Sequence, residues 1–171
     1  MGQLSTATLR TATPADASSL AALALEVWLS TYIRHGINAH FADFALAHFT
    51  PERFKSWIED PDHRLIVSQN RDGIDGFIHI GRNSPDPVGG HIRTELTSLY
   101  IQPRHQGRGL GKALLDAALD QADHPVWLAV NCENTKARAF YKTQGFSKLG
   151  ETAFRIGDKS YPNDVLMRQP L

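Results

Sequence analysis

The chain has 171 residues, of which 42% are hydrophobic. This length suits one domain with its own core and is short for two, so we expect a single domain over residues 1–171. The 18 basic residues balance the 18 acidic ones, which argues against a nucleic-acid partner because such binders usually carry excess positive charge.

The N-terminal part begins with a strand followed by a helix. The letters "ATLRTAT" at 7–13 are typical of a short strand with Leu9 facing inward. Thr13 and Pro14 form a helix start, with Thr13 as the cap and Pro14 in the first turn. Helical spacing of apolar residues then predicts a helix as far as about Tyr32.

The next segment combines helices with a hairpin. Residues 41–49 and 51–60 have helical patterns, and strands are expected at 64–69 and 74–81. The letters "NRDG" between these strands favour a hairpin turn. The composition of residues 83–90, "NSPDPVGG", predicts a loop.

The C-terminal half alternates strands with helices. Residues 91–101 are a strand rich in β-branched side chains, a helix follows to about Ala122, and 125–130 is a buried type of strand. A helix over 134–144 and two final strands complete the chain. The order β-α-α-ββ-β-α-β-α-ββ predicts a mixed α/β (α+β) sheet of about six to seven strands, flanked by helices, with a parallel central pair.

The stretch "RHQGRGLGKALLDAAL" at 104–119 could cradle a phosphate in three ways. A Walker loop is excluded because Gln106 stands where a glycine is needed and Ala113 replaces the Mg²⁺-binding hydroxyl. A dinucleotide fingerprint is excluded because Gly107, Gly109 and Gly111 are spaced two and two. The third pattern, Gln/Arg-x-x-Gly-x-Gly/Ala between a strand and a helix, is satisfied.

This third pattern resembles the GNAT superfamily of acetyl-CoA-dependent N-acetyltransferases. The likeness extends over "SLYIQPRHQGRGLGKALL" and then "WLAVNCENTKARAFYKTQGF", in wording, order and separation. It implies the GNAT fold. The ending "AFRIGDKSYPNDVLMR", with Trp28 and Tyr32, most resembles the branch that contains bacterial spermine/spermidine acetyltransferases.

The physics of the loop supports the binding of a pyrophosphate. The first turn of a helix offers unpaired N–H donors and a partial positive charge, and glycines let a ligand come close. We expect one buried helix face made of Leu110, Ala113, Leu114, Ala117 and Ala118. The residues expected to contact acetyl-CoA here are Leu99, Tyr100, Ile101, Gln106, Gly107, Arg108, Gly109, Leu110, Gly111 and Lys112.

The second motif begins at the end of an apolar strand. Asn134 is a good helix cap, and Phe140 is expected to pack inward. The resemblance implies that Asn134 binds the pantetheine arm, with Asn131 close to it. It also implies that Tyr141 protonates the leaving thiolate, whereas a helical tyrosine taken alone is usually a core aromatic with a satisfied hydroxyl.

Glu95 is the candidate base. Strand alternation puts its side chain on the same face as Thr97, Leu99 and Ile101. The resemblance implies that Glu95 takes the proton of the amine, often through water, while a backbone N–H at the strand's end polarises the thioester carbonyl. A solvent-facing carboxylate is the alternative.

The predicted function is the direct transfer of an acetyl group from acetyl-CoA to a primary amine. The acceptor would be a small molecule such as a polyamine, or a peptide amine. Residues 1–60 hold six acidic and four basic residues, a difference too small to choose. A non-catalytic acyl-CoA-binding or sensor module is the alternative, since it would need the loop but neither Glu95 nor Tyr141.

The remaining features of the sequence concern the cellular compartment, metal binding and oligomeric state. Cys132 is the one cysteine, so no disulfide forms within the chain and a reducing cytoplasm is expected. Glu133 beside it argues against a covalent acetyl-cysteine. The N-terminus and the hydropathy predict neither a signal peptide nor membrane association, and the eight histidines form no metal motif. A homodimer is left open.

Overall fold

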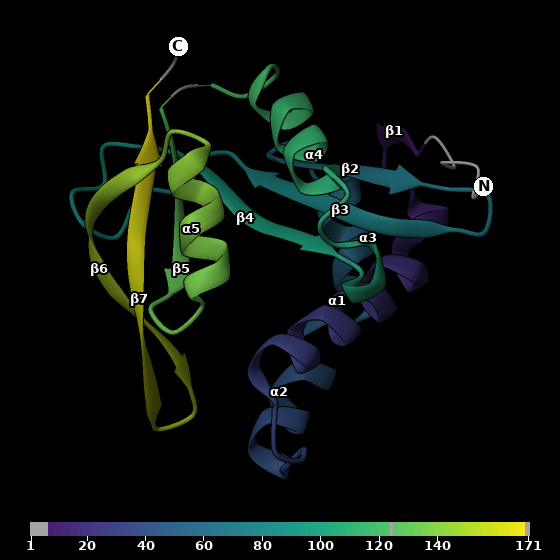
Figure 1. Cartoon of the computed structure of the whole chain (residues 1–171), viewed down its shortest axis with the longest axis horizontal. Coiled ribbons are helices and arrows are strands. Elements are labelled where there is room, and N and C mark those ends of the chain that lie inside the picture. The colour runs from purple at the N-terminus through teal and green to yellow at the C-terminus, as the bar shows by residue number, and fades with distance from the viewer. Residues whose placement is uncertain (1–6, 124, 170–171) are drawn as a thin grey trace. The chain divides into compact units, whose positions relative to one another are not determined.

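Seven strands form one mixed sheet in the part of the chain that the structure describes, residues 7–123 and 125–169. The sheet order in this computed structural model is β1-β2-β3-β4-β5-β7-β6 (Figure 1). The strands are β1 (Thr8–Thr11), β2 (His63–Gln69), β3 (Ile74–Gly81), β4 (Thr94–Ile101), β5 (Val126–Asn131), β6 (Ser147–Ile156) and β7 (Lys159–Arg168). The helices are α1 (Ala17–Tyr32), α2 (Ala39–His48), α3 (Pro51–Glu59), α4 (Leu110–Leu119) and α5 (Thr135–Thr143), with 3₁₀ turns η1 (Pro14–Asp16) and η2 (Pro103–His105).

The parallel central pair is confirmed, and the element order agrees with the predicted one except that three helices, α1, α2 and α3, precede β2 where the predicted order has two. Strands β4 and β5 run parallel, with Glu95 opposite Trp127, whereas β1 with β2, β5 with β7 and β6 with β7 are antiparallel. A parallel pair requires a long crossover, and the loop with α4 supplies it. No helix of the described residues is long and apolar enough to cross a bilayer.

The chain divides into two compact units. One unit holds residues 1–79 and 98–120, and the other holds residues 80–97 and 121–171. The single domain expected over 1–171 stays a prediction. The expected lack of a signal peptide concerns the first twenty residues, of which 1–6 lie outside the described residues.

The core of the first unit lies between helices and strands β2 and β3. Helices α1 and α3 pack together, and both α3 and α4 contact β2. Phe54 of α3 meets Phe77 of β3 edge to face, at 5.6 Å between ring centroids, and both side chains are fully buried. Burial of such large aromatic surfaces is the main stabilising contribution here.

The buried face of α4 differs from the expected one. Leu114 and Ala118 are buried as predicted, but Ala113 is exposed. Leu115 and Leu119 complete the face instead. An alanine-rich helix gives little contrast along its sides, and the two larger leucines turn the buried stripe toward themselves.

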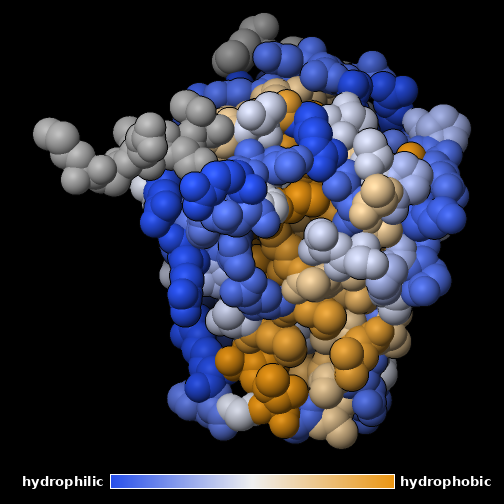
Figure 2. Space-filling view, turned by 90° about the vertical axis from the view of Figure 1, so that its right-hand side faces the viewer, coloured by the Kyte–Doolittle hydropathy of each residue, from blue (hydrophilic) through white to orange (hydrophobic). Residues whose placement is uncertain are grey.

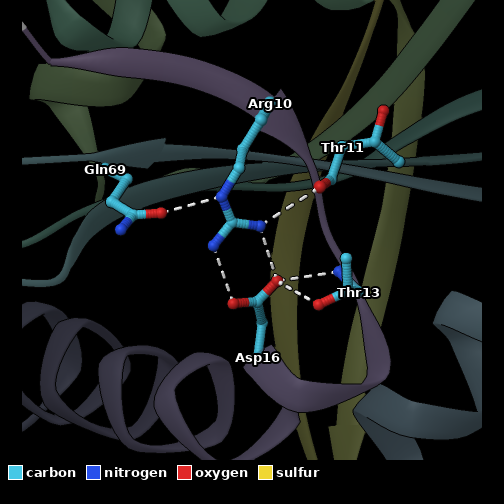
Figure 3. Close-up of polar contacts among 5 residues, drawn as sticks. All are labelled: Arg10, Thr11, Thr13, Asp16 and Gln69. Atoms are coloured by element: carbon cyan, nitrogen blue, oxygen red, sulfur yellow. Dashed lines mark hydrogen bonds and ion pairs between the residues drawn. The ribbon is translucent and has the colours of Figure 1, made fainter.

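An ion pair fixes the start of the first helical segment. Arg10 of β1 donates to both carboxylate oxygens of Asp16 at 2.8 Å each, and to Gln69 at 2.7 Å (Figure 3). The backbone N–H of Thr13 donates to the same carboxylate at 2.7 Å. These bonds lower the pKa of Asp16 to about 2, and the bond from Arg10 has the largest effect. The carboxylate therefore ties the cap predicted at Thr13 to the edge of the sheet.

A pair of imidazoles, one of them buried, joins β2 to β3. His79 is 1% exposed, and its Nε2 lies 2.8 Å from Nδ1 of His63. The ring of Trp57 covers it at 4.8 Å between centroids. Burial, reinforced by His63, lowers the pKa of His79 to about 3. His79 is therefore a neutral core residue.

This pair predicts acid sensitivity. Below pH ~6.5, the ordinary pKa of histidine, the unfolded chain binds a proton that folded His79 excludes. The contribution of His79 to the free energy of unfolding is therefore complete above that pH and declines as the pH falls toward about 3, by at most ~1.4 kcal/mol per pH unit. Denaturant titrations across this range should show a shallower decline for His79→Phe. The matched His91→Phe change, at an exposed position, should keep the full slope, and equal slopes in both variants would contradict the prediction.

Strand β4 begins later in the sequence than expected. The strand starts at Thr94 rather than at residue 91. The carboxylate of Asp86 accepts the backbone N–H of Ile92 at 2.9 Å, and the N–H of Asp86 donates to the carbonyl of Ile92 at 2.8 Å. Ile92 is therefore bound by its own loop and is unavailable to a neighbouring strand, despite its β-branched side chain.

Candidate active site

The strand end of β4 and the loop after it belong to the first unit. The side-chain amide of Gln106 donates to the carbonyl of Ile101 at 3.1 Å, which closes the loop onto its own strand. Gly107 and Gly109 have φ angles of 75° and 81°. These are left-handed conformations that side chains disfavour. The sequence pattern therefore describes a backbone shape as well as a composition.

Space is open beside the two left-handed glycines. A Cβ placed on Gly107 or Gly109 would meet no described atom within 4 Å. Packing within the protein therefore does not require glycine here, whereas the backbone conformation does. Gly109 is the N-cap of α4, so the unpaired N–H groups of the first turn begin beside this open space, as an anion site requires.

The base of the loop is held by a buried carboxylate that the sequence analysis missed. Asp75 of β3 is 3% exposed, and one of its oxygens lies 3.2 Å from Nδ1 of His105 and 3.1 Å from the amide of Asn70. Its carbonyl accepts the N–H of Gln102 at 2.9 Å. An acidic residue between apolar neighbours in "GIDGFIHI" was the available signal.

Close packing also sets how near the end of β4, where the loop begins, lies to β3. A Cβ on Gly76 of β3 would lie 2.7 Å from Ile101 and 3.3 Å from Leu114. The same Cβ would lie 3.2 Å from the backbone carbonyl oxygen of Tyr100, so glycine at this position lets the end of β4 approach β3 closely. Gly76 was not identified from sequence, because a glycine in a strand does not reveal which neighbour approaches it.

The two cations of the loop differ. Arg108 is exposed, whereas the ammonium of Lys112 forms an ion pair with Asp116 one turn along α4. Both remain predicted acetyl-CoA contacts, together with Leu99 and Tyr100 of β4. The Lys112 charge is shared with its own helix.

The turn after β5 belongs to the second unit and brings the two predicted asparagines together. The N–H of Asn134 donates to the carbonyl of Asn131 at 3.0 Å. The side-chain oxygen of Asn131 accepts from Glu133 at 2.8 Å, and that of Asn134 accepts from Ala137 at 3.1 Å. The helix-cap prediction for Asn134 is confirmed, and Asn131 forms the turn that precedes the cap.

Tyr141 is the buried aromatic of α5. Its side chain is 7% exposed, and its ring lies 5.3 Å from Phe140 and 5.5 Å from Phe146. The prediction that Phe140 packs inward is wrong in degree, since Phe140 is only half-buried. Adjacent helical residues point about 100° apart, and Tyr141 takes the inward position.

A buried carboxylate fastens α5 to the last two strands. Asp164 of β7 is 2% exposed and pairs with Arg138 of α5 at 2.9 Å and with Lys148 of β6 at 2.8 Å. These cations lower the pKa of Asp164, and the hydrogen bond from Lys148 has the largest effect. The Cys132 thiol lies 3.7 Å from this carboxylate, and burial together with Asp164 raises the pKa of Cys132. A raised pKa favours the thiol over the nucleophilic thiolate, which supports the interpretation of Cys132 as a bystander.

Glu95 is half-buried in β4. One carboxylate oxygen accepts a hydrogen bond of 2.6 Å from the hydroxyl of Ser84. Ser84 was not identified from sequence, because a serine in a proline- and glycine-rich loop carries no distinguishing signal. Glu95, Asn131, Asn134 and Tyr141 lie in the second unit, whereas Gln106 to Lys112 lie in the first.

Comparison with known proteins identifies the family. A model of the acetyltransferase (GNAT) family matches residues 29–146. An uncharacterized N-acetyltransferase of Mycobacterium bovis is 31% identical over 160 residues, which cover 91% of this chain and 98% of that protein. The N-alpha-acetyltransferase RimI of Mycobacterium tuberculosis is 29% identical over 101 residues, 58% of this chain and 62% of RimI.

The fold has close solved counterparts. The crystal structure of the PaiA N-acetyltransferase from Thermoplasma acidophilum, in complex with coenzyme A, superposes with a TM-score of 0.76 at 19% identity. The match covers 96% of this chain and 99% of that one. This chain, with its seven-stranded mixed sheet and parallel β4–β5 pair, therefore shares the fold of that structure. The chain therefore belongs to the GNAT family of acetyltransferases.

Proposed function

We propose that the chain transfers an acetyl group from acetyl-CoA to a primary amine by direct attack. The observation that carries this proposal is the loop at Gly107 and Gly109, which is left-handed, open to a ligand and placed at the start of α4. A helix start suits the pyrophosphate of coenzyme A through backbone N–H donors. The complex of PaiA with coenzyme A supports the same cosubstrate.

Each predicted contact has a part in holding the cosubstrate. Backbone groups of Gln106 to Gly111 would hold the pyrophosphate, with Arg108 and Lys112 adding positive charge. Asn131 and Asn134 would hydrogen-bond the pantetheine arm. Acetyl-CoA, when bound, supplies the acetyl group as a thioester, which is electrophilic at its carbonyl carbon.

Glu95 is the proposed proton acceptor. An amine with a pKa of about 10.4 is only about one part in a thousand neutral at pH 7.4, and only the neutral form can attack. A carboxylate that takes the ammonium proton, directly or through water, releases the lone pair. The half-buried position of Glu95 and its ionic hydrogen bond to Ser84 support this role.

Tyr141 is the proposed proton donor to sulfur. As the new nitrogen–carbon bond forms and the carbon–sulfur bond breaks, the departing thiolate accepts a proton from the phenol, and the phenolate then takes up the proton that the acylated nitrogen loses. A backbone N–H of Leu99 to Ile101 would stabilise the charge on the carbonyl oxygen meanwhile. A thiol with a pKa near 8.5 is already a tolerable leaving group, so the contribution of Tyr141 is modest.

The acceptor is proposed as a peptide amine or a small amine such as a polyamine. The names of RimI and of the peptidyl-lysine N-acetyltransferase YjaB of Salmonella typhimurium favour a peptide amine. Figure 2 shows a hydrophobic area on one face of the molecule. Three large hydrophobic residues at the end of α1, in the connection to α2 and in α2 are exposed, namely Tyr32, Ile37 and Leu46. An apolar surface suits an acceptor with hydrophobic neighbours better than a polycation, which would need acidic side chains.

A panel assay tests the function. The protein is incubated with acetyl-CoA and with polyamines, aminoglycosides and peptides that offer an N-terminal or a lysine amine, and free thiol is followed by colour. Thiol release with one amine class identifies the acceptor. Tight binding of coenzyme A in calorimetry, with no turnover across the panel, would favour the sensor module instead.

Replacement of Tyr141 by phenylalanine tests the proton donor. We expect the turnover number to fall about tenfold, while acetyl-CoA affinity stays close to wild type because the ring packing is retained. Stopped-flow turnover and calorimetry measure the two effects. Tyr161→Phe, at a half-buried strand position in β7, is the matched control. An unchanged turnover number for Tyr141→Phe removes this residue from the mechanism.

A further inference from the structure

The loop between β3 and β4 is fastened internally by Asp86. Its carboxylate accepts backbone N–H groups from Val88 at 3.0 Å, Gly89 at 2.7 Å and Ile92 at 2.9 Å. Burial alone would raise the pKa of Asp86, but these bonds outweigh burial and lower it to about 2. A loop rich in proline and glycine thereby gains a fixed shape.

The same loop is also packed onto its unit. A Cβ on Gly150 of β6 would lie 2.6 Å from Val88, so the strand leaves room for that side chain. Ile92 is buried in a cluster with Trp127 and Val165. The loop is therefore held by apolar contacts at both of these points as well as by Asp86.

Within this loop, Ser84 is held through both of its backbone groups. Its N–H donates to the carbonyl of Arg93 at 2.9 Å, and its carbonyl accepts the indole N–H of Trp127 at 2.8 Å. The preceding residue, Asn83, has a φ of 53° and is the one non-glycine position with positive φ in the described chain. Such a conformation costs about 1 kcal/mol or more, so the surrounding contacts maintain it.

The fixed backbone directs the hydroxyl of Ser84 at Glu95. The hydroxyl oxygen lies 2.6 Å from a carboxylate oxygen of Glu95, a short and ionic hydrogen bond. Glu95 is the register partner of Trp127 across the parallel pair. Ser84 thus bonds to two residues that face each other across the parallel pair. Its hydroxyl donates to Glu95 of β4, and its carbonyl accepts from Trp127 of β5.

We propose that Ser84 is a positioning residue for Glu95, which holds the carboxylate in one orientation and keeps it ionised. This inference rests on the proposed role of Glu95 as proton acceptor. A hydroxyl that donates to a carboxylate favours the charged form, and a glutamate must be charged to accept a proton from an ammonium ion. Ser84 itself keeps its proton throughout.

Other charged groups of this loop have their own partners or face solvent. Arg82 pairs with Asp123 at 3.9 Å, the charge of Asp86 is used by backbone N–H groups, and Arg93 is exposed. These groups stay in place in Ser84→Ala, so a change in the titration of Glu95 would not come from them.

The test combines a spectroscopic titration with a kinetic one. The side-chain carboxyl carbons are observed by ¹³C NMR as the pH is varied, and Glu95→Gln assigns the signal of Glu95. Ser84→Ala is expected to move the titration midpoint of this signal upward by about one pH unit, and Ser84→Thr, which keeps the hydroxyl, to restore it. Ser56→Ala, at an exposed position on α3, is the control for a serine change in general.

The pH profile of kcat/KM, measured with the acceptor found in the panel assay, is expected to shift in the same direction as the NMR titration of Glu95. Its acidic limb should move upward in Ser84→Ala by the same amount, and kcat/KM at neutral pH should fall several-fold because the carboxylate is no longer held in one orientation. An unmoved NMR titration in Ser84→Ala overturns the role of Ser84, whether or not the protein has turnover. A moved titration with an unmoved kinetic limb removes Glu95 as the proton acceptor, and so overturns that part of the proposed function.

Discussion

Glu95→Gln is expected to lower kcat/KM for the amine by on the order of 100-fold at neutral pH, because general base catalysis contributes ~10²–10⁴-fold. Glutamine keeps the shape of the side chain and an oxygen that can accept the Ser84 hydroxyl, but it cannot take up the proton of an ammonium ion. The loss should become smaller as the pH rises toward the pKa of the amine, because solvent then supplies the neutral form.

Steady-state kinetics from neutral to alkaline pH checks this expectation. Glu52→Gln removes an exposed carboxylate in the first turn of α3, which controls for the loss of one negative charge. Acetyl-CoA affinity should be the same in both variants. A loss that is independent of pH would contradict the role of Glu95 as a base and would favour a role in holding the acceptor.

Gly109→Val is expected to weaken acetyl-CoA binding by on the order of 100-fold, which corresponds to about 2.7 kcal/mol. Gly109 has a φ of 81° and caps α4. A β-branched residue cannot keep this conformation without a penalty of about 1–2 kcal/mol, so the backbone would leave it and turn the N–H donors away. Its methyl groups would also occupy the open space beside the loop.

Gly157→Val separates the loss of affinity from the loss of stability. Gly157 has a φ of 60° in the turn between β6 and β7, and a Cβ there would likewise meet no described atom within 4 Å. Both variants should therefore lose a similar part of the free energy of unfolding, measured by chemical denaturation. Calorimetry should show weak acetyl-CoA binding for Gly109→Val alone, and an equal loss of affinity in both variants would argue against the loop as the binding site.

The parts of the molecule that could be predicted from sequence are those set by neighbours along the chain. The glycine pattern and the helix caps at Asn134 and Thr13 are local, because each depends on backbone groups within a few residues. The order of strands and helices followed from the same local signals, and the parallel pair followed from the crossover length. For this reason the elements agree with the sequence to within a few residues.

The remainder depends on pairs that are distant in sequence. Asp75 holds His105 from thirty residues away, and the indole of Trp127 reaches the carbonyl of Ser84 across forty-three. The hydrophobic periodicity of a strand does not indicate which loop its residues will contact. The same limit explains Ile92, whose β-branched side chain favours a strand while the distant carboxylate of Asp86 already takes its N–H.

The cluster around Asp164 has a consequence for natural variation in this chain. Helix α5 has one buried side chain, Tyr141, so its location depends heavily on the ion pair of Arg138 with Asp164. A change that removes this cation would let the helix shift, whereas loss of Lys148, which pairs with Asp164 from β6, would weaken the contact between the last two strands instead. Surveys of variants should therefore find a partly exposed basic residue of α5 among the positions that tune turnover, although it is not expected to touch a reacting atom.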